Sequence, residues 1–456
     1  MSWPDPDTPG GPTTPAPGLG TGTVGDVPGP DASAVTRARA TQPASAASTP
    51  SDPDETTPPA LPALQLREPL PALTRTQSQL EAAVAALAAG RGPVAVDTER
   101  ASGYRYGQRA YLVQLRREGA GTFLVDPIAA PDLEPLAQVL SGPEWVLHAA
   151  SQDLPCLAEI GLVPQEVFDT ELAARLLGWE RVGLAAVVER VLGHTLAKVH
   201  GAADWSTRPL PREWLEYAAL DVEVLVELRD ALSGELDRTG KAQFARQEFE
   251  AVRTAPPAAP REDPWRRTSG LHRVRTRRGL AVVEQVWGTR DRLAQEADVA
   301  PGRLLPDSAV IALATTLPRE GTSLTEIPGF HGRGAGRHHR EWSAALRRAW
   351  QLTESDLPTA ARRGDGPPPP RAWAQRDPAA AARLDRARAA LADRAATLSM
   401  PVENLLTPEL VRRVMWQPPA DGDVAGQLLA AGARPWQVQQ CADLLVEAIT
   451  PTAAAG

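Results

Sequence analysis

Two acidic residues, Asp97 and Glu99, follow the short apolar run at residues 93–96 and are separated by a single threonine. The small and β-branched residues before them predict a buried strand, and alternation along a strand places both carboxylates on one side. Neighbouring carboxylates repel each other and raise each other's pKa unless a cation lies between them, which favours a divalent metal site. Alone, the pair also fits a solvated turn at a strand end.

Three further polar residues extend this pattern along the chain. Asp153 follows an apolar run at residues 145–147 and is expected just inside a helix, where an acid also complements the helix N-terminus. Tyr217 and Asp221 are four residues apart and therefore share one helical face. Taken separately, Asp153 fits an ordinary helix start, and the Tyr217–Asp221 pair fits an ordinary amphipathic helix.

Taken together and in this order, these residues resemble the three motifs of the DEDD exonuclease superfamily in its tyrosine-containing branch. The residues are Asp97, Glu99, Asp153, Tyr217 and Asp221. Residues 168–178, with Phe-Asp-Thr before Ala-Ala-Arg-Leu-Leu-Gly, and residues 204–210, Asp-Trp-Ser-Thr-Arg-Pro-Leu, narrow the resemblance to the ribonuclease D family. It covers about residues 75–245.

The resemblance implies an α/β fold of the ribonuclease H-like kind, with a mixed sheet flanked by helices and followed by two small all-α HRDC-like domains. It implies a 3′-5′ exoribonuclease that releases nucleoside 5′-monophosphates from RNA with an accessible 3′ end, tRNA precursors included. Two divalent metal ions, Mg²⁺ or Mn²⁺, would support hydrolysis, and hard cations of this kind prefer carboxylate oxygens.

The resemblance also implies a role for each residue. Asp97 would bridge both metal ions, Glu99 and Asp221 would complete the site that activates water, and Asp153 would hold the second ion. Tyr217 would orient the attacking water, because a phenol with a pKa near 10 is a poor base at neutral pH. Asp169 is expected to cap the helix that begins at Thr170.

Composition divides the chain into six parts. Residues 1–60 contain 13 of the 45 prolines and almost no large apolar side chain, so we expect disorder there. The expected parts are a tail at 1–65, an exonuclease domain at 66–254, a linker at 255–275, an HRDC domain at 276–355, a proline-rich linker at 356–375, and a second, diverged HRDC-like domain at 376–450. The last two domains align as a repeat at an offset of 101 residues, through 299–306 and 400–407.

Two arginine-rich stretches predict nucleic-acid contacts. Residues 265–280 hold six arginines and no acid, and residues 329–340 are basic and rich in glycine. Exposed arginines and backbone amides suit phosphate contacts that do not read sequence, although a solvated surface loop is the alternative. Lys198, one of two lysines beside 46 arginines, is a candidate phosphate contact or a plain surface lysine. The predicted nucleic-acid-binding residues are Lys198, Arg266, Arg267, Arg333, Arg337 and Arg340.

Bulk properties exclude some classes of protein. The net charge of −8 falls mostly on residues 1–60, so it says little about partners of the folded part. Cys156 and Cys441 are far apart and indicate neither a disulfide framework nor a zinc site. The sequence contains no long apolar run that would span a membrane, so we expect a cytoplasmic protein without a membrane partner, and a monomer is favoured over an oligomer.

Two other functions remain open from the sequence. A DNA 3′-5′ exonuclease could use the same fold, because HRDC-like modules also occur in helicases that act on DNA. A non-catalytic RNA-binding adaptor is disfavoured, because all five motif positions keep side chains that can do the chemistry.

Overall fold

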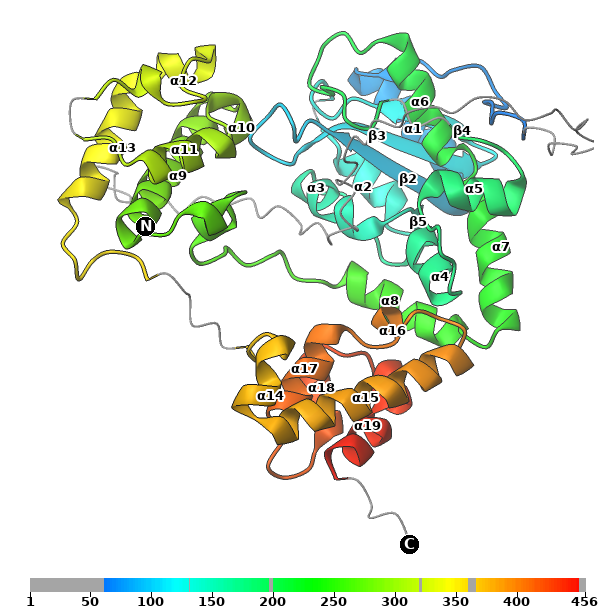
Figure 1. Ribbon diagram of the computed structural model, residues 1–456. Coiled ribbons are helices and arrows are strands. Elements are labelled where there is room, and N and C mark those ends of the chain that lie inside the picture. Colours follow the sequence, from blue (N-terminus) through cyan, green and yellow to red (C-terminus); the bar gives the residue numbers. More distant parts are fainter. Residues whose placement is uncertain (1–60, 131, 197–199, 320–321, 360–365, 451–456) are drawn as a thin grey trace, which may run out of the picture.

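The computed structural model describes residues 61–130, 132–196, 200–319, 322–359 and 366–450. A mixed six-stranded sheet forms the centre of the first domain (Figure 1). Its strands are β1 (Leu73–Thr74), β2 (Arg91–Arg100), β3 (Ala110–Glu118), β4 (Gly121–Val125), β5 (Trp145–Leu147) and β6 (Val167–Asp169). In the order β1-β4-β3-β2-β5-β6, only the β4/β3 and β3/β2 pairs are antiparallel. The expected mixed sheet is confirmed.

Strand β2 lies between β3 and β5 and carries the paired carboxylates. Val94 and Val96 pack with residues of α1 and α2 on one face, whereas Ala95 packs with α4 and α7 on the other. Alternation along the strand therefore directs Asp97 and Glu99 to the same face as Ala95. The sequence indicated that these carboxylates follow the end of the strand. The strand instead runs on to Arg100, so both carboxylates lie inside it.

Helices cover both faces of this sheet. They are α1 (Gln77–Ala89), α2 (Glu134–Leu140), α3 (Leu154–Glu159), α4 (Thr170–Leu176), α5 (Leu184–Leu192), α6 (Arg212–Glu223), α7 (Leu225–Arg238) and α8 (Ala242–Arg253). Helix α1 is capped at its start, because the Thr76 hydroxyl accepts a hydrogen bond from the Gln79 amide while the Gln79 side chain accepts one from the Thr76 amide.

A first helical unit follows and has a core of its own. Its elements are the 3₁₀ turns η2 (Pro264–Arg267), η3 (Leu271–Arg273) and η4 (Leu324–Glu326) and the helices α9 (Arg277–Ala297), α10 (Pro301–Leu304), α11 (Asp307–Thr316), α12 (Arg333–Arg337) and α13 (His339–Gln351). Trp342 and Phe330 are fully buried at its centre. Trp265 and Val274 join this core, so most of the expected linker at 255–275 packs as part of the unit.

The second helical unit shares a core with the exonuclease domain. Its elements are η5 (Pro370–Ala372) and the helices α14 (Trp373–Arg376), α15 (Pro378–Thr397), α16 (Val402–Leu405), α17 (Pro408–Trp416), α18 (Val424–Ala430) and α19 (Pro435–Ile449). Buried residues from α4, α7 and α8 and from α15 to α19 form one continuous apolar cluster. Trp373, placed by the sequence in the linker at 356–375, is fully buried in that cluster.

The two helical units repeat the same opening elements. Helices α9, α10 and α11 begin at Arg277, Pro301 and Asp307, and their counterparts α15, α16 and α17 begin 101 residues later in each case. The offset read from the sequence therefore corresponds to equivalent structure. At the other end of the chain, Leu64 donates its amide proton to the Thr195 carbonyl oxygen, so residues expected in the tail contact the exonuclease domain.

Candidate active site

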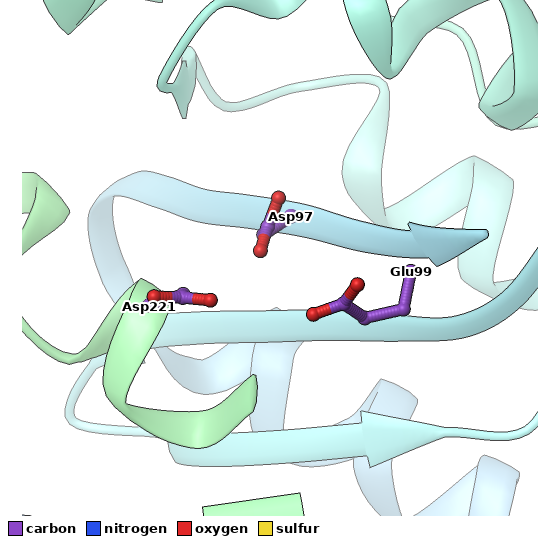
Figure 2. Close-up of side chains that lie close together, drawn as sticks. All are labelled: Asp97, Glu99 and Asp221. Carbon is purple, nitrogen blue, oxygen red and sulfur yellow. The ribbon is translucent and has the colours of Figure 1, made fainter. Parts of the chain in front are cut away.

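Three carboxylates converge on the face of the sheet below α6. Asp97 and Glu99 extend from β2 and Asp221 approaches from α6, with ligand oxygens all within 4.8 Å of one another (Figure 2). They line a pocket of about 490 Å³, to which Asp153 and Tyr217 also contribute. The structure thus gathers all five residues that the sequence proposed for catalysis, although they come from three separate segments.

Asp153 precedes α3 and does not serve that helix. It occupies the N-cap position, one residue earlier than expected, and its side chain accepts no capping hydrogen bond. Its side chain is 8% exposed and its partner is Arg100, whose guanidinium lies 3.7 Å from Asp153 Oδ1. An ordinary helix-start acid would be solvated or bonded to backbone amides, so helix capping does not account for Asp153.

Buried Asp169 holds the loop that presents Asp153. Its carboxylate accepts hydrogen bonds from the amides of Glu171 and Leu172 at the start of α4, which confirms the expected cap. It also accepts from the amides of Ala149 and Ala150, across the loop that follows β5. Asp169 therefore fixes two segments at once, and the loop leading to Asp153 cannot shift without losing hydrogen bonds to a buried charge.

Tyr217 is held by aromatic neighbours and by Asp221. The phenol donates a hydrogen bond to the Asp221 carboxylate one helical turn away, and the ring contacts His200 edge-on at 5.8 Å between centroids. Burial first, and then the negative charges of Asp221 and Glu99, raise the pKa of Tyr217 above its ordinary value. The hydroxyl therefore stays protonated at neutral pH and can only donate or accept hydrogen bonds.

The segment at 204–210 anchors the start of α6. Arg208 forms a two-pronged ion pair with the fully buried Asp126, at 2.8 and 2.9 Å, and donates to the carbonyl oxygens of Trp205 and Tyr111. Trp205 is completely buried beside α6. This motif does not enter the pocket; it sets the position of the helix that carries Tyr217 and Asp221.

The carboxylates raise one another's pKa values. Burial raises the pKa of Asp97 to about 6, and burial together with the charges of Asp97, Asp221 and Asp153 raises the pKa of Glu99 to about 10. Burial and the Asp97 charge also raise the pKa values of Asp153 and Asp221 well above the ordinary value. Such a cluster cannot carry its full negative charge at neutral pH without added positive charge.

The donor set fits a divalent cation. All four acidic side chains offer oxygen, the ligand that hard cations prefer, and none of the pocket-lining residues is a cysteine. Gln114, opposite Asp97 in the β2/β3 register, is fully buried and its amide group has no hydrogen-bond partner among the described residues. Gln114 does not line the pocket, so the support for a cation comes from the four carboxylates.

The predicted nucleic-acid-binding residues are not gathered at this pocket. Arg266 pairs with Asp263 at 2.9 Å and donates to the Thr359 carbonyl oxygen, so it is engaged within the first helical unit. Arg267, Arg337 and Arg340 are exposed on that unit. Lys198 and the side chain of Arg333 lie outside the described part of the chain, so their roles stay predictions.

Sequence reasoning missed Arg100 and Asp126. Arg100 follows Glu99 directly and lines the pocket, although alternation predicts the opposite face for it. The β2/β3 register shifts between Glu99 and Arg100, and such an irregularity turns side chains away from simple alternation. The only sequence signal for Asp126 was an acid at the end of an apolar run. Its partner Arg208 is 82 positions away in the chain, so no local pattern connects the two residues.

Family models match three regions of the chain. A 3′-5′ exonuclease model matches residues 71–237, an HRDC domain model matches residues 279–346, and a model described as a 3′ to 5′ exonuclease C-terminal domain matches residues 366–449. The third match coincides with the unit that shares its core with the exonuclease domain. The sequence-based assignment of that unit as a diverged HRDC-like domain stays a prediction.

Relatives and solved structures agree with these matches. Ribonuclease D of Acidiphilium cryptum is 33% identical over 312 residues, which cover 66% of this chain and 78% of the relative. Ribonuclease D of Escherichia coli K12 is 31% identical over 274 residues, 58% of this chain and 71% of the relative.

Two crystal structures are similar along most of their length. A protein from Bifidobacterium adolescentis is 37% identical with a TM-score of 0.77, covering 85% of this chain and 99% of its own. The RNase D of Escherichia coli, described as an exoribonuclease involved in structured RNA processing, is 25% identical with a TM-score of 0.58, covering 79% of this chain and 98% of its own.

None of the described helices is long and apolar enough to cross a membrane. With an exonuclease domain, an HRDC domain and relatives of this similarity, the chain belongs to the ribonuclease D family and is a 3′-5′ exoribonuclease.

Proposed function

We propose that this exoribonuclease removes nucleoside 5′-monophosphates one at a time from the 3′ end of RNA, with two divalent ions, Mg²⁺ or Mn²⁺. The observation that carries the proposal is the convergence of buried carboxylates from β2 and α6 with Asp153 in one pocket. Asp97, Glu99, Asp153 and Asp221 would hold the ions. When bound, such ions activate a water molecule and stabilise the leaving oxygen.

The chain's own residues then position the reactants. Tyr217, kept protonated by its surroundings and hydrogen-bonded to Asp221, would orient the attacking water. Asp169 and Arg208 would act through geometry, because they fix the loop before Asp153 and the start of α6. Neither touches the pocket, so we expect them to affect both substrate affinity and rate only by displacing the carboxylates.

The substrate proposed is RNA with an accessible 3′ end, tRNA precursors included. The RNase D of Escherichia coli, a structural neighbour, is described as acting in structured RNA processing. Arg267, Arg337 and Arg340 on the first helical unit are exposed, and in the described part of the chain no ion-pair partner is found for them. They would bind phosphates without reading sequence, which predicts a steep salt dependence on long RNA.

The test uses the purified chain and its Asp97→Asn variant with 5′-labelled single-stranded RNA and matched DNA, in Mg²⁺, in Mn²⁺ or in chelator. We expect a metal-dependent ladder that shortens from the 3′ end of RNA and is lost in Asp97→Asn. Equal digestion of DNA would instead support a general 3′-5′ exonuclease. RNA that is bound but stays intact would point to the adaptor function.

A further inference from the structure

Arg100 is the one arginine or lysine among the described residues that line the catalytic pocket. Its side chain is 24% exposed, so the guanidinium reaches a space that solvent, and therefore substrate, can enter. Its position on β2 directly after Glu99 places it beside the carboxylates that we assign to the metal ions. A cation at this place requires an explanation, because most of the remaining charged groups of the pocket are acidic.

The hydrogen-bonding capacity of Arg100 is almost unused. Its single ion pair, to Asp153 Oδ1, is 3.7 Å long, which exceeds a normal hydrogen-bond length. Arg208, which anchors the start of α6, shows what a structural arginine looks like here: its three nitrogens donate to Asp126 and to backbone carbonyl oxygens at 2.8 to 2.9 Å. Arg100 has five such donors and no hydrogen-bond acceptor among the described residues.

A phosphate group would accept hydrogen bonds from these donors. The planar fork of a guanidinium matches two oxygens of a phosphate, and this pairing is among the strongest that proteins make with nucleic acids. The alternative, a permanent counter-ion for Asp153, requires a close and well-aligned pair, which the 3.7 Å separation does not provide. Metal ions on Asp153 would weaken that contact further and leave the guanidinium to the substrate.

We propose that Arg100 is a substrate-binding residue of this site, and that its guanidinium binds the phosphate which links the 3′-terminal nucleotide to the rest of the RNA. That phosphate is the one on which the product leaves as a nucleoside 5′-monophosphate. The inference rests on the proposed function of the pocket and adds to it a contact made by protein directly to the scissile group.

The experiment compares two short RNAs with Ca²⁺ in place of Mg²⁺, so that hydrolysis is slowed. One is ordinary triadenylate, and the other carries an uncharged methylphosphonate at its last linkage. Arg100→Met should weaken binding of the ordinary RNA by about tenfold to a hundredfold, the range expected for hydrogen bonds to a charged group. Binding of the uncharged RNA should change by less than about twofold, because the lost partner of Arg100 is the charge itself.

Two further variants sharpen the result. Arg100→Lys keeps a charge without the fork, so it should show an intermediate loss on the ordinary RNA only. Arg91→Met removes an exposed arginine from the opposite end of the same strand, where it pairs with Glu118, and should change neither affinity. The melting temperature of each variant establishes whether it is folded. If Arg100→Met does not fold, the comparison of the two RNAs is made with Arg100→Lys.

Calorimetric titration of Mg²⁺ separates this inference from the proposed function. Asp97→Asn should lose metal binding, whereas Arg100→Met should bind Mg²⁺ as tightly as the parent chain or more tightly, because a competing cation is gone. Equal loss of both RNAs, or weakened Mg²⁺ binding in Arg100→Met, would overturn the phosphate contact and make Arg100 a support for Asp153. Unchanged affinity for the ordinary RNA would overturn it as well.

Discussion

The two helical units of this chain begin with the same three helices and yet relate differently to the exonuclease domain. The second unit merges its apolar core with that of α4, α7 and α8. The first unit keeps its own core and meets the domain through the loop at 101–109, where Ala300 donates to the Tyr104 carbonyl oxygen and Arg303 lies over the Tyr104 ring at 3.9 Å. Figure 1 shows the two units against different parts of the domain.

The difference indicates what each unit can do. Contacts to the second unit include the Phe244 and Trp436 rings, stacked at 4.5 Å, and the buried Lys241, whose ammonium donates to the carbonyl oxygens of Leu176 and Ser399. A shared apolar core unfolds as one body, whereas a small polar interface permits separate unfolding and relative motion. We therefore expect two thermal transitions from this chain, and not one or three.

Removal of the second unit should have the largest effect. Truncation after residue 359 exposes the apolar surface of α4, α7 and α8 that the unit covers, so the remaining exonuclease domain should aggregate or lose its cooperative transition. The isolated fragment 262–359 should fold, because its core is its own. Circular dichroism melting of both fragments checks this expectation. A truncated domain that melts like the full chain would show that the shared core is dispensable.

Two fully buried tryptophans provide a matched pair of substitutions. Trp373→Ala in the second unit and Trp342→Ala in the first should each destabilise the body that contains it by about 3 to 5 kcal/mol. The first change should lower the transition that also reports on the exonuclease domain and reduce activity near that temperature, whereas the second should leave cleavage of short RNA unchanged. Scanning calorimetry with a parallel activity assay distinguishes them; equal effects on activity would contradict the division.

Metal and pH should act on one transition only. The raised pKa of Asp97, about 6, means that the folded chain binds a proton more tightly than the unfolded chain. This stability is fully present below the unfolded pKa near 4 and is lost as pH rises through 6, at a cost of at most about 3 kcal/mol. Without metal, the exonuclease transition should therefore fall between about pH 4 and 6, and Mg²⁺ should restore it.

The first helical unit serves as the internal control for this titration. It contributes no residue to the carboxylate pocket, so its transition should stay constant with chelator and with Mg²⁺ at any one pH. The variant Asp97→Asn should reduce the pH response of the exonuclease transition between about pH 4 and 6. An unchanged response in Asp97→Asn would assign the titration to other groups, with Glu99, Asp153 and Asp221 the first to examine because burial raises their pKa values as well.

Single contacts at the two interfaces should show the smallest effects. Lys241→Met removes two hydrogen bonds made by a buried ammonium. It should lower the free energy of unfolding of the body that contains the exonuclease domain by about 1 to 3 kcal/mol. Arg303→Met removes an exposed contact with the Gly103 carbonyl oxygen and the Tyr104 ring, which is worth at most about 1 kcal/mol. Calorimetry measures both, and a larger effect from Arg303→Met would reverse the ranking of the interfaces.

Much of the fold could be read from local patterns. The strand before Asp97, the Asp169 cap and the 101-residue repeat depend on local sequence patterns, and the structure has each of them. Domain limits were less accurate, because a tryptophan in a proline-rich stretch gives no local sign of its partners. Trp265 and Trp373 both sit in expected linkers and both are buried.

The sequence by itself determined which groups are available for chemistry: four carboxylates and a tyrosine, in an order that resembles one nuclease family. Only the tertiary structure decided that three of the carboxylates meet within 4.8 Å, that Arg208 belongs to an anchor and that Arg100 belongs to the pocket. The physical reason is that strand periodicity fixes a side chain's face only while the pairing is regular. The packing of α6 on β2, and the shift after Glu99, depend on contacts between segments far apart in the chain.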